Sequence, residues 1–202
     1  MTQSPAATII TCGIFRKELA ALGYSHKSAE KLVCLNSMLH MRPSMLDELL
    51  DGMLRGKTLR HLLVYGDCCP HMDEFARRDG VRRVEGVNCC EIILGRERYR
   101  ELRRDGVFFF MPEWTRRWER VFKNELGFTT QETAQEFMRE MHTRLIYLNT
   151  GVEEVPRDTL ADIEAYLGMP VEVFTTGLGH LEAAVLAGLR SLNTAGDASN
   201  DT

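Results

Sequence analysis

The sequence predicts a single Rossmann-like α/β domain, in which a mainly parallel sheet carries helices on both faces. Short β-branched or aromatic runs alternate with longer amphipathic stretches, an order typical of repeated β-α units. The chain has 202 residues, 44% of them hydrophobic and 27% charged, the composition of an ordinary globular protein. A chain of this length forms a core without disulfides or metal, so its six cysteines need another explanation.

The strands are predicted from short apolar runs that end at turn-forming residues. The first run ends at Cys12-Gly13, and the third ends at Gly66, where glycine permits a sharp turn. The run at 81–86 has mixed polarity and is the weakest. The predicted strands cover residues 7–11, 32–35, 61–65, 81–86, 107–111, 145–148 and 171–174.

Helices are predicted in the intervals between these strands, from apolar residues at helical spacing. Ser44 is expected to cap one helix, and Gly56 to end it. Pro70 suits the first turn of a short helix. A further helix carries four apolar residues on one side, Ile92, Ile93, Tyr99 and Leu102. The others begin near Phe15, begin at Pro112, contain Phe137 and Met141, span 156–167 and follow Gly177-Leu178-Gly179.

The end of the chain differs in composition from the rest. Residues 193–202 are polar and small, so we expect the domain to cover residues 1–192 and the tail to be disordered.

Charge and composition exclude several partners. Lys and Arg number 25 against 29 Asp and Glu, a net charge of −4 that gives no footprint for nucleic acid. No apolar run is long enough to cross a membrane, and residues 1–5 lack the features of a secretory signal. We therefore expect a cytoplasmic protein with no membrane or nucleic-acid partner, whose thiols stay reduced.

Three cysteines occupy equivalent places along the chain. Cys12, Cys68 and Cys89 each follow a predicted strand, at the turn that leads into a helix. In an open parallel sheet these turns gather at the carboxyl edge, where such folds bind ligands. Helix N-termini at the same turns are expected to lower the thiol pKa values and favour bound thiolates. The sequence therefore predicts a metal site on these three cysteines, and Cys69 and Cys90 supply spare ligands.

The spacing does not choose the metal. Three thiolates suit an iron–sulfur cluster that keeps one iron free for substrate, or a zinc ion whose fourth position is open or filled by histidine. His71, three residues after Cys68, is a candidate for that fourth ligand. The structural alternative is that small cysteines fill tight turns and core positions, which we favour for Cys34 within its apolar run. Glu91 is either an acid or base in the same cleft or a stabiliser of a helix N-terminus.

Three motifs resemble the family known as domain of unknown function 1638. They are Cys12-Gly13, Tyr65-Gly66-Asp67-Cys68 and the run from Asn88 to Tyr99, followed by Phe108-Phe109 and Glu113-Trp114. The similarity spans about residues 8 to 180. It implies a Rossmann-like fold with a cysteine at each of the three turns, and a genomic association with corrinoid-dependent methyl transfer. Cys69 stands where many members carry glycine, and Cys90 is a second thiol, so either of them could replace its neighbour as a ligand.

These observations lead to one preferred hypothesis and two alternatives. We expect Cys12, Cys68 and Cys89 to hold an iron–sulfur cluster, in support of corrinoid-dependent methyl transfer or one-carbon metabolism. The partners would then be proteins of a corrinoid methyltransferase system or a small-molecule substrate. The alternatives are a zinc-dependent enzyme and a non-metal accessory or thiol-redox binding protein. Whether the protein is an enzyme, and which residues are catalytic, stays open from sequence.

Overall fold

The computed structural model describes residues 6–56 and 60–198. It confirms the predicted α/β class with parallel strands, and all seven predicted strands are present. The strands form two parallel sheets, with the orders β2-β1-β3-β4 and β5-β6-β7. The described residues divide correspondingly into two compact units. Of the described residues, 6–56, 60–93 and 179–198 form unit 1, and Leu94–Leu178 form unit 2. The sequence did not predict this division of the strands.

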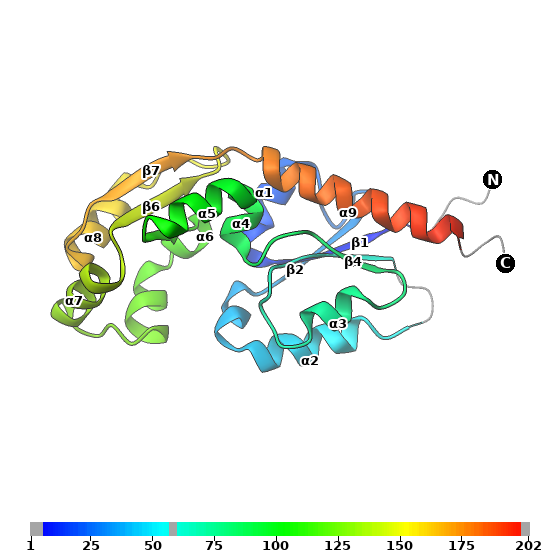
Figure 1. Ribbon diagram of the computed structural model, residues 1–202, viewed down its shortest axis with the longest axis horizontal. Helices are drawn as coiled ribbons and strands as arrows, with labels where there is room; N and C mark the ends of the chain where they lie inside the picture. Colours follow the sequence, from blue (N-terminus) through cyan, green and yellow to red (C-terminus); the bar gives the residue numbers. More distant parts are fainter. Residues whose placement is uncertain (1–5, 57–59, 199–202) are drawn as a thin grey trace. The chain divides into compact units, whose positions relative to one another are not determined.

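Unit 1 contains the four-stranded sheet and the helices that cover it (Figure 1). Its strands are β1 (Thr8–Cys12), β2 (Lys31–Leu35), β3 (His61–Val64) and β4 (Val81–Arg83). Its helices are η1 (Gly13–Phe15), α1 (Arg16–Ala21), η2 (Ser37–Met41), α2 (Pro43–Met53), α3 (Met72–Ala76), α4 (Cys89–Leu94, whose last residue belongs to unit 2) and α9 (Gly179–Ala198). Figure 1 shows α2 and α3 on one side of the sheet and α9 on the other.

The register of these strands aligns their carboxyl ends. Thr11 on β1 pairs with Cys34 on β2 and with Val64 on β3. The face of the sheet toward α2 and α3 packs into one apolar cluster. Its buried members are Ile10, Leu46, Leu50, Leu54, Leu63, Tyr65, Cys69, Met72, Phe75 and Val81. The apolar spacing of α2 therefore provides the surface on which the ends of β1 and β3 rest.

Unit 2 contains the three-stranded sheet. Its strands are β5 (Val107–Phe110), β6 (Arg144–Asn149) and β7 (Val171–Thr175). Its helices are α5 (Arg96–Arg104), α6 (Pro112–Thr115), the π-helix η3 (Arg120–Glu125), α7 (Gln131–Met141) and α8 (Arg157–Leu167). Aromatic rings fill part of this core: Phe110 stacks on Phe122 with their centroids 5.5 Å apart.

Several boundaries differ from those expected. The helix predicted to carry both Ile92 and Leu102 is broken at Gly95, whose φ of 78° ends α4 and begins α5. No side chain caps α2, which begins at Pro43 instead of being capped by Ser44. At the other end of the chain, α9 continues to Ala198, into the segment expected to be disordered, and residues 199–202 lie outside the described residues. Across the described helices, none is both long and apolar enough to cross a bilayer.

Candidate metal centre

The sheet of unit 1 brings three cysteine-bearing turns to one edge. Strands β1, β3 and β4 are consecutive in this sheet and all parallel, so their carboxyl ends lie together. Cys12 is the last residue of β1, Cys68 lies in the turn after β3, and Cys89 begins α4 after β4. All three side chains are half-buried, and none of the three is in a disulfide.

Close backbone contact joins the second and third turns. A Cβ atom on Gly66 would lie 2.4 Å from both the Asn88 Cα and the Val87 carbonyl oxygen, so only glycine fits there. The amide of Asp67 donates to that same carbonyl oxygen at 2.9 Å. The turn that carries Cys68 therefore rests directly on the residues before Cys89.

Side-chain hydrogen bonds fix the first turn of α4. The Asn88 side-chain oxygen accepts from the Glu91 amide at 2.9 Å, and the Glu91 carboxylate accepts from the Val87 amide at 3.3 Å. This reciprocal pattern resembles a capping box. It differs in that the Glu91 carboxylate accepts from the amide of Val87, the residue before Asn88, and not from the amide of Asn88 itself. Glu91 thus stabilises a helix N-terminus, the second of the two roles considered for it, and Cys89 is held on an ordered turn.

The expected lowering of the thiol pKa is wrong for Cys68 and Cys89. Burial and the negative charge of a neighbouring Cys89 thiolate raise the pKa of the Cys68 thiol to about 11. A hydrogen bond between the Cys89 and Cys90 thiols, together with burial, raises the pKa of Cys89 well above its usual value. Partial removal from water disfavours the charged thiolate at both positions. At neutral pH these thiols are protonated in the metal-free chain.

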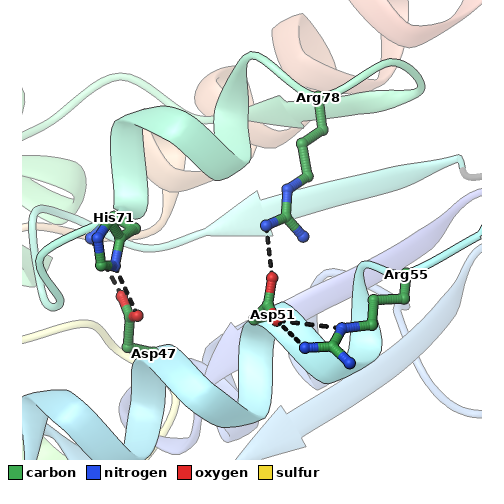
Figure 2. A network of polar contacts seen from close by, with 5 residues as sticks. All are labelled: Asp47, Asp51, Arg55, His71 and Arg78. Atoms are coloured by element: carbon green, nitrogen blue, oxygen red, sulfur yellow. Dashed lines mark hydrogen bonds and ion pairs between the residues drawn. The ribbon is translucent and has the colours of Figure 1, made fainter.

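Cys69 and His71 both contact Asp47 on α2. His71 Nδ1 lies 2.7 Å from the Asp47 carboxylate, whose other oxygen accepts from the His71 amide at 3.0 Å (Figure 2). Burial, then a hydrogen bond to Asp47, raises the pKa of the Cys69 thiol to about 12. The spare thiol at this turn is therefore engaged with α2, and the candidate fourth ligand is oriented by a carboxylate through Nδ1.

Cys34 lies on the opposite face of the sheet from Cys12. Successive side chains of a strand alternate between the two faces, and Cys34 pairs with Thr11, one residue before Cys12. Its neighbours Val33 and Leu35 pack against the cluster under α2, whereas Cys34 is not among the residues of that cluster. Cys34 therefore lies on the face away from Cys12, and its structural role stays a prediction.

Tyr65 is a buried residue between strand β3 and the turn that carries Cys68. It directly follows β3, its side chain is 2% exposed, and it belongs to the cluster against which Cys12 and Cys68 pack. Its hydroxyl group has no hydrogen-bond partner among the described residues. Burial and the negative charges of Cys12 and Cys68 thiolates raise its pKa strongly, which places these sulfurs within electrostatic reach of the hydroxyl.

Thiols on three turns at one edge of the sheet are the donor type that a thiolate-bound metal uses, but they are not grouped as a metal site. Within the part of the chain that the structure describes, no three His, Cys, Asp or Glu side chains are grouped so that they could hold a metal ion. Binding would therefore require the thiols to lose their protons and move together.

Sequence reasoning missed two residues of this site, Tyr65 and Asp47. In the sequence, Tyr65 is the last residue of an apolar strand run, so it gives no sign of a special role. In the structure its hydroxyl is buried beside Gly66. Asp47 gives no local signal, because it lies on α2 and reaches the turn after β3 only in the folded chain.

Comparison with protein families gives one match. The family model described as "Protein of unknown function (DUF1638)" matches residues 34–185. The matched range contains Cys68 and Cys89 and begins after Cys12. No curated protein matches the chain, and no solved structure does.

Proposed function

Because the chain belongs to the DUF1638 family, whose description assigns no activity, we propose a function from the site itself: Cys12, Cys68 and Cys89 bind a metal centre. The observation that carries this proposal is the strand order, since β1, β3 and β4 are adjacent and each is followed by one of the three thiols. The preferred centre is an iron–sulfur cluster held by these three cysteines in the reducing cytoplasm.

The raised thiol pKa values make metal binding at this edge depend on pH. Burial, together with a negative charge on Cys89, makes ionisation of Cys68 harder, so a metal must displace protons in order to bind. A bound metal ion reverses this effect because its positive charge stabilises both thiolates. Metal binding should therefore release protons and weaken as the pH falls.

A centre with only three protein ligands keeps one coordination position open for a substrate. A cluster with three cysteine ligands leaves one iron open to a substrate, and a zinc ion with three thiolates leaves one open coordination position. The residues of the chain hold the group, exclude part of the solvent through the cluster under α2, and keep the α4 turn ordered.

Anaerobic reconstitution tests the proposal. The wild-type chain, supplied with iron and sulfide, should retain both and absorb visible light, and Cys12→Ser, Cys68→Ser or Cys89→Ser should each lose most of the metal. Cys34→Ser is the matched control, because this half-buried thiol lies on the other face of the same sheet. A colourless, metal-free wild type, or equal loss in Cys34→Ser, contradicts the proposal. Stoichiometric zinc without visible absorption identifies the zinc alternative.

A second candidate is a non-metal accessory or thiol-redox binding protein. It is favoured by the protonated state of the thiols and by the direct hydrogen bond between Cys89 and Cys90. Alkylation of intact anaerobic protein, read by mass spectrometry, separates the two functions. Protection of Cys12, Cys68 and Cys89 that a chelator removes supports the metal, whereas equal labelling with and without chelator supports the second candidate.

A role in corrinoid-dependent methyl transfer or one-carbon metabolism stays a prediction from the family resemblance. Binding measurements between the reconstituted protein and corrinoid methyltransferase components test it. Binding that requires the metal-loaded form is the expected result, and no binding in either form contradicts it.

A further inference from the structure

One face of α5 carries arginine side chains that have no ion-pair partner in the described chain. These residues are exposed and line one hollow in the surface of unit 2, and we call them the basic face: Arg100, Arg103 and Arg104. None of their guanidinium groups forms an ion pair or a hydrogen bond with a described residue, whereas Arg98 on the same helix pairs with Glu101 at 2.6 Å. Glu97 and Tyr99 also line the hollow, which therefore keeps a surplus of positive charge.

The electrostatics of α5 itself explain only part of the basic face. The C-terminal end of a helix favours positive charge, which suits Arg103 and Arg104 in the last turn of α5. Arg100 lies before that turn, four residues from Arg104, and like charges at this spacing repel one another. The basic face therefore destabilises its own helix, and a negatively charged partner would remove that repulsion.

The helix α7 of the same unit carries the opposite charge. Its acidic face is exposed, has a four-residue spacing and lines a second hollow: Glu132, Glu136 and Glu140. Arg139 also lines this hollow, but its guanidinium donates to the Gln135 side chain at 2.9 Å. The three carboxylates form no ion pair with any residue that the structure describes. Glu140 stands next to the end of α7, where the helix dipole disfavours negative charge, so the helix itself does not explain the acidic face.

Exposed apolar side chains lie beside the acidic face. Phe137 and Met141 directly follow Glu136 and Glu140 and are 39% and 56% exposed. Because surface ion pairs contribute little on their own, a stable contact needs apolar area as well. The aliphatic stems of arginine cover such area, and a guanidinium group stacks on an aromatic ring such as that of Phe137. The surface of α7 is therefore suited to arginine side chains.

The two faces match in spacing but do not meet within one chain. Arg100 and Arg104 are four residues apart, as are successive carboxylates of the acidic face, and rows of this spacing pack against each other between helices. Figure 1 shows α5 and α7 separated within unit 2, and the side chains of the two faces form no ion pairs with each other. A second copy of the chain offers each face its complement.

We propose that two copies of the chain associate, with the basic face of α5 in one copy docked on the acidic face of α7 in the other. In a two-fold dimer this contact occurs twice, because each copy contributes both faces. The arginines reach into the acidic hollow, and their stems cover Phe137 and Met141. The contact lies in unit 2 and is independent of the metal proposed for unit 1.

Sedimentation velocity of the full chain, without added metal, tests this inference. At about 0.1 mM protein the wild type should be a dimer in about 0.1 M salt and a monomer in about 1 M salt, which screens the charges. Arg100→Glu/Arg104→Glu and Glu136→Arg/Glu140→Arg should each weaken association more than about tenfold, because like charges then face each other. An equimolar mixture of these two variants should restore the dimer, since both contacts regain opposite charges.

The control variant is Asp158→Arg/Asp162→Arg on α8, which reverses two exposed carboxylates at the same spacing that also form no ion pair with a described residue. It should dimerise like the wild type. A wild type that is monomeric in about 0.1 M salt overturns the inference. A dimer that both test variants leave intact, that the mixture does not restore, or that the control weakens equally overturns it too.

Hydrogen exchange of the wild type replaces the variants if circular dichroism shows that they fold poorly. Both α5 and α7 should gain protection together as the protein concentration rises. Unchanged exchange in either helix overturns the inference. None of these outcomes bears on the metal centre, which is tested separately by reconstitution.

Discussion

Gly66 is the residue on which the geometry of the site depends most directly. Any side chain there would meet backbone atoms of Val87 and Asn88, which cannot move aside as a flexible side chain would. The closeness of the Cys68 and Cys89 turns is therefore a consequence of one missing Cβ atom. The cysteines at these two turns do not by themselves bring the turns together.

Gly66→Ala should destabilise the protein by about 1–3 kcal/mol, because overpacking forces backbone shifts. It should also lower metal retention, since the two turns must separate. Urea unfolding and metal analysis measure the two effects. Gly52→Ala is the control: Gly52 lies on α2, and a Cβ atom added there would meet no other atom within 4 Å, so alanine should stabilise that helix by up to about 1 kcal/mol. Equal effects of the two substitutions would contradict this view of Gly66.

At the scale of the element, α4 presents Cys89 through its N-terminal cap. Asn88→Ala removes the oxygen that accepts from the Glu91 amide and should cost about 1 kcal/mol. The first turn of α4 should then fray, so metal affinity falls although no thiol is changed. Chemical unfolding and zinc competition measure both quantities. Asn88→Asp keeps an acceptor at the cap and should retain the affinity. A loss of affinity as large as that of Asn88→Ala would show that the cap is not the cause.

The contact between α2 and the turn before α3 should depend on pH. Hydrogen bonding to Asp47 and its charge raise the pKa of His71 above its usual value of 6.5. Burial opposes the shift in Asp47, but hydrogen bonds from His71 and Cys69 outweigh it and lower that pKa below 3.8. The contribution of His71 to the free energy of unfolding is therefore complete below pH 6.5, and it disappears as the pH rises through the raised pKa of His71. The contribution of Asp47 to the free energy of unfolding is present above pH 3.8, and it disappears as the pH falls through the lowered pKa of Asp47.

His71→Gln should accordingly lose more stability at about pH 5.5 than at about pH 8.5, when compared with the wild type by urea unfolding. Asp51→Asn is the matched control from the same helix. Asp51 pairs with Arg78 and Arg55, whose guanidinium groups stay charged across this range (Figure 2). Asp51→Asn should therefore lose the same amount of stability at both pH values. A pH-independent effect of His71→Gln would show that the pair does not titrate as described.

At the scale of the molecule, the unfolding of each unit can be followed by a different side chain. All six cysteines lie in unit 1, and both tryptophans, Trp114 and Trp118, lie in unit 2. A ligand that binds only the folded form stabilises the unit that holds it. Zinc should therefore raise the denaturant midpoint of thiol exposure and leave the midpoint of tryptophan fluorescence unchanged. Equal shifts of both midpoints would show that the two units unfold together.

The pattern of apolar runs along the chain determines much of the fold. Each predicted strand is present because short β-branched runs between turn residues have few other ways to be buried. The placement of Cys12, Cys68 and Cys89 after strands is equally local, since it needs only the strand ends. Gly95 shows where local reasoning fails: one glycine at positive φ splits a continuous apolar pattern into two helices.

By itself, the sequence determined the parallel α/β class, the strands and the three cysteines that follow them, because these depend on residues close together in the chain. Tertiary structure alone decided that the strands divide into two sheets and that the thiol pKa values of Cys68 and Cys89 are raised instead of lowered. It also decided that the Tyr65 hydroxyl is enclosed without a partner among the described residues. These outcomes depend on how distant segments pack together, which also sets how much water reaches each atom.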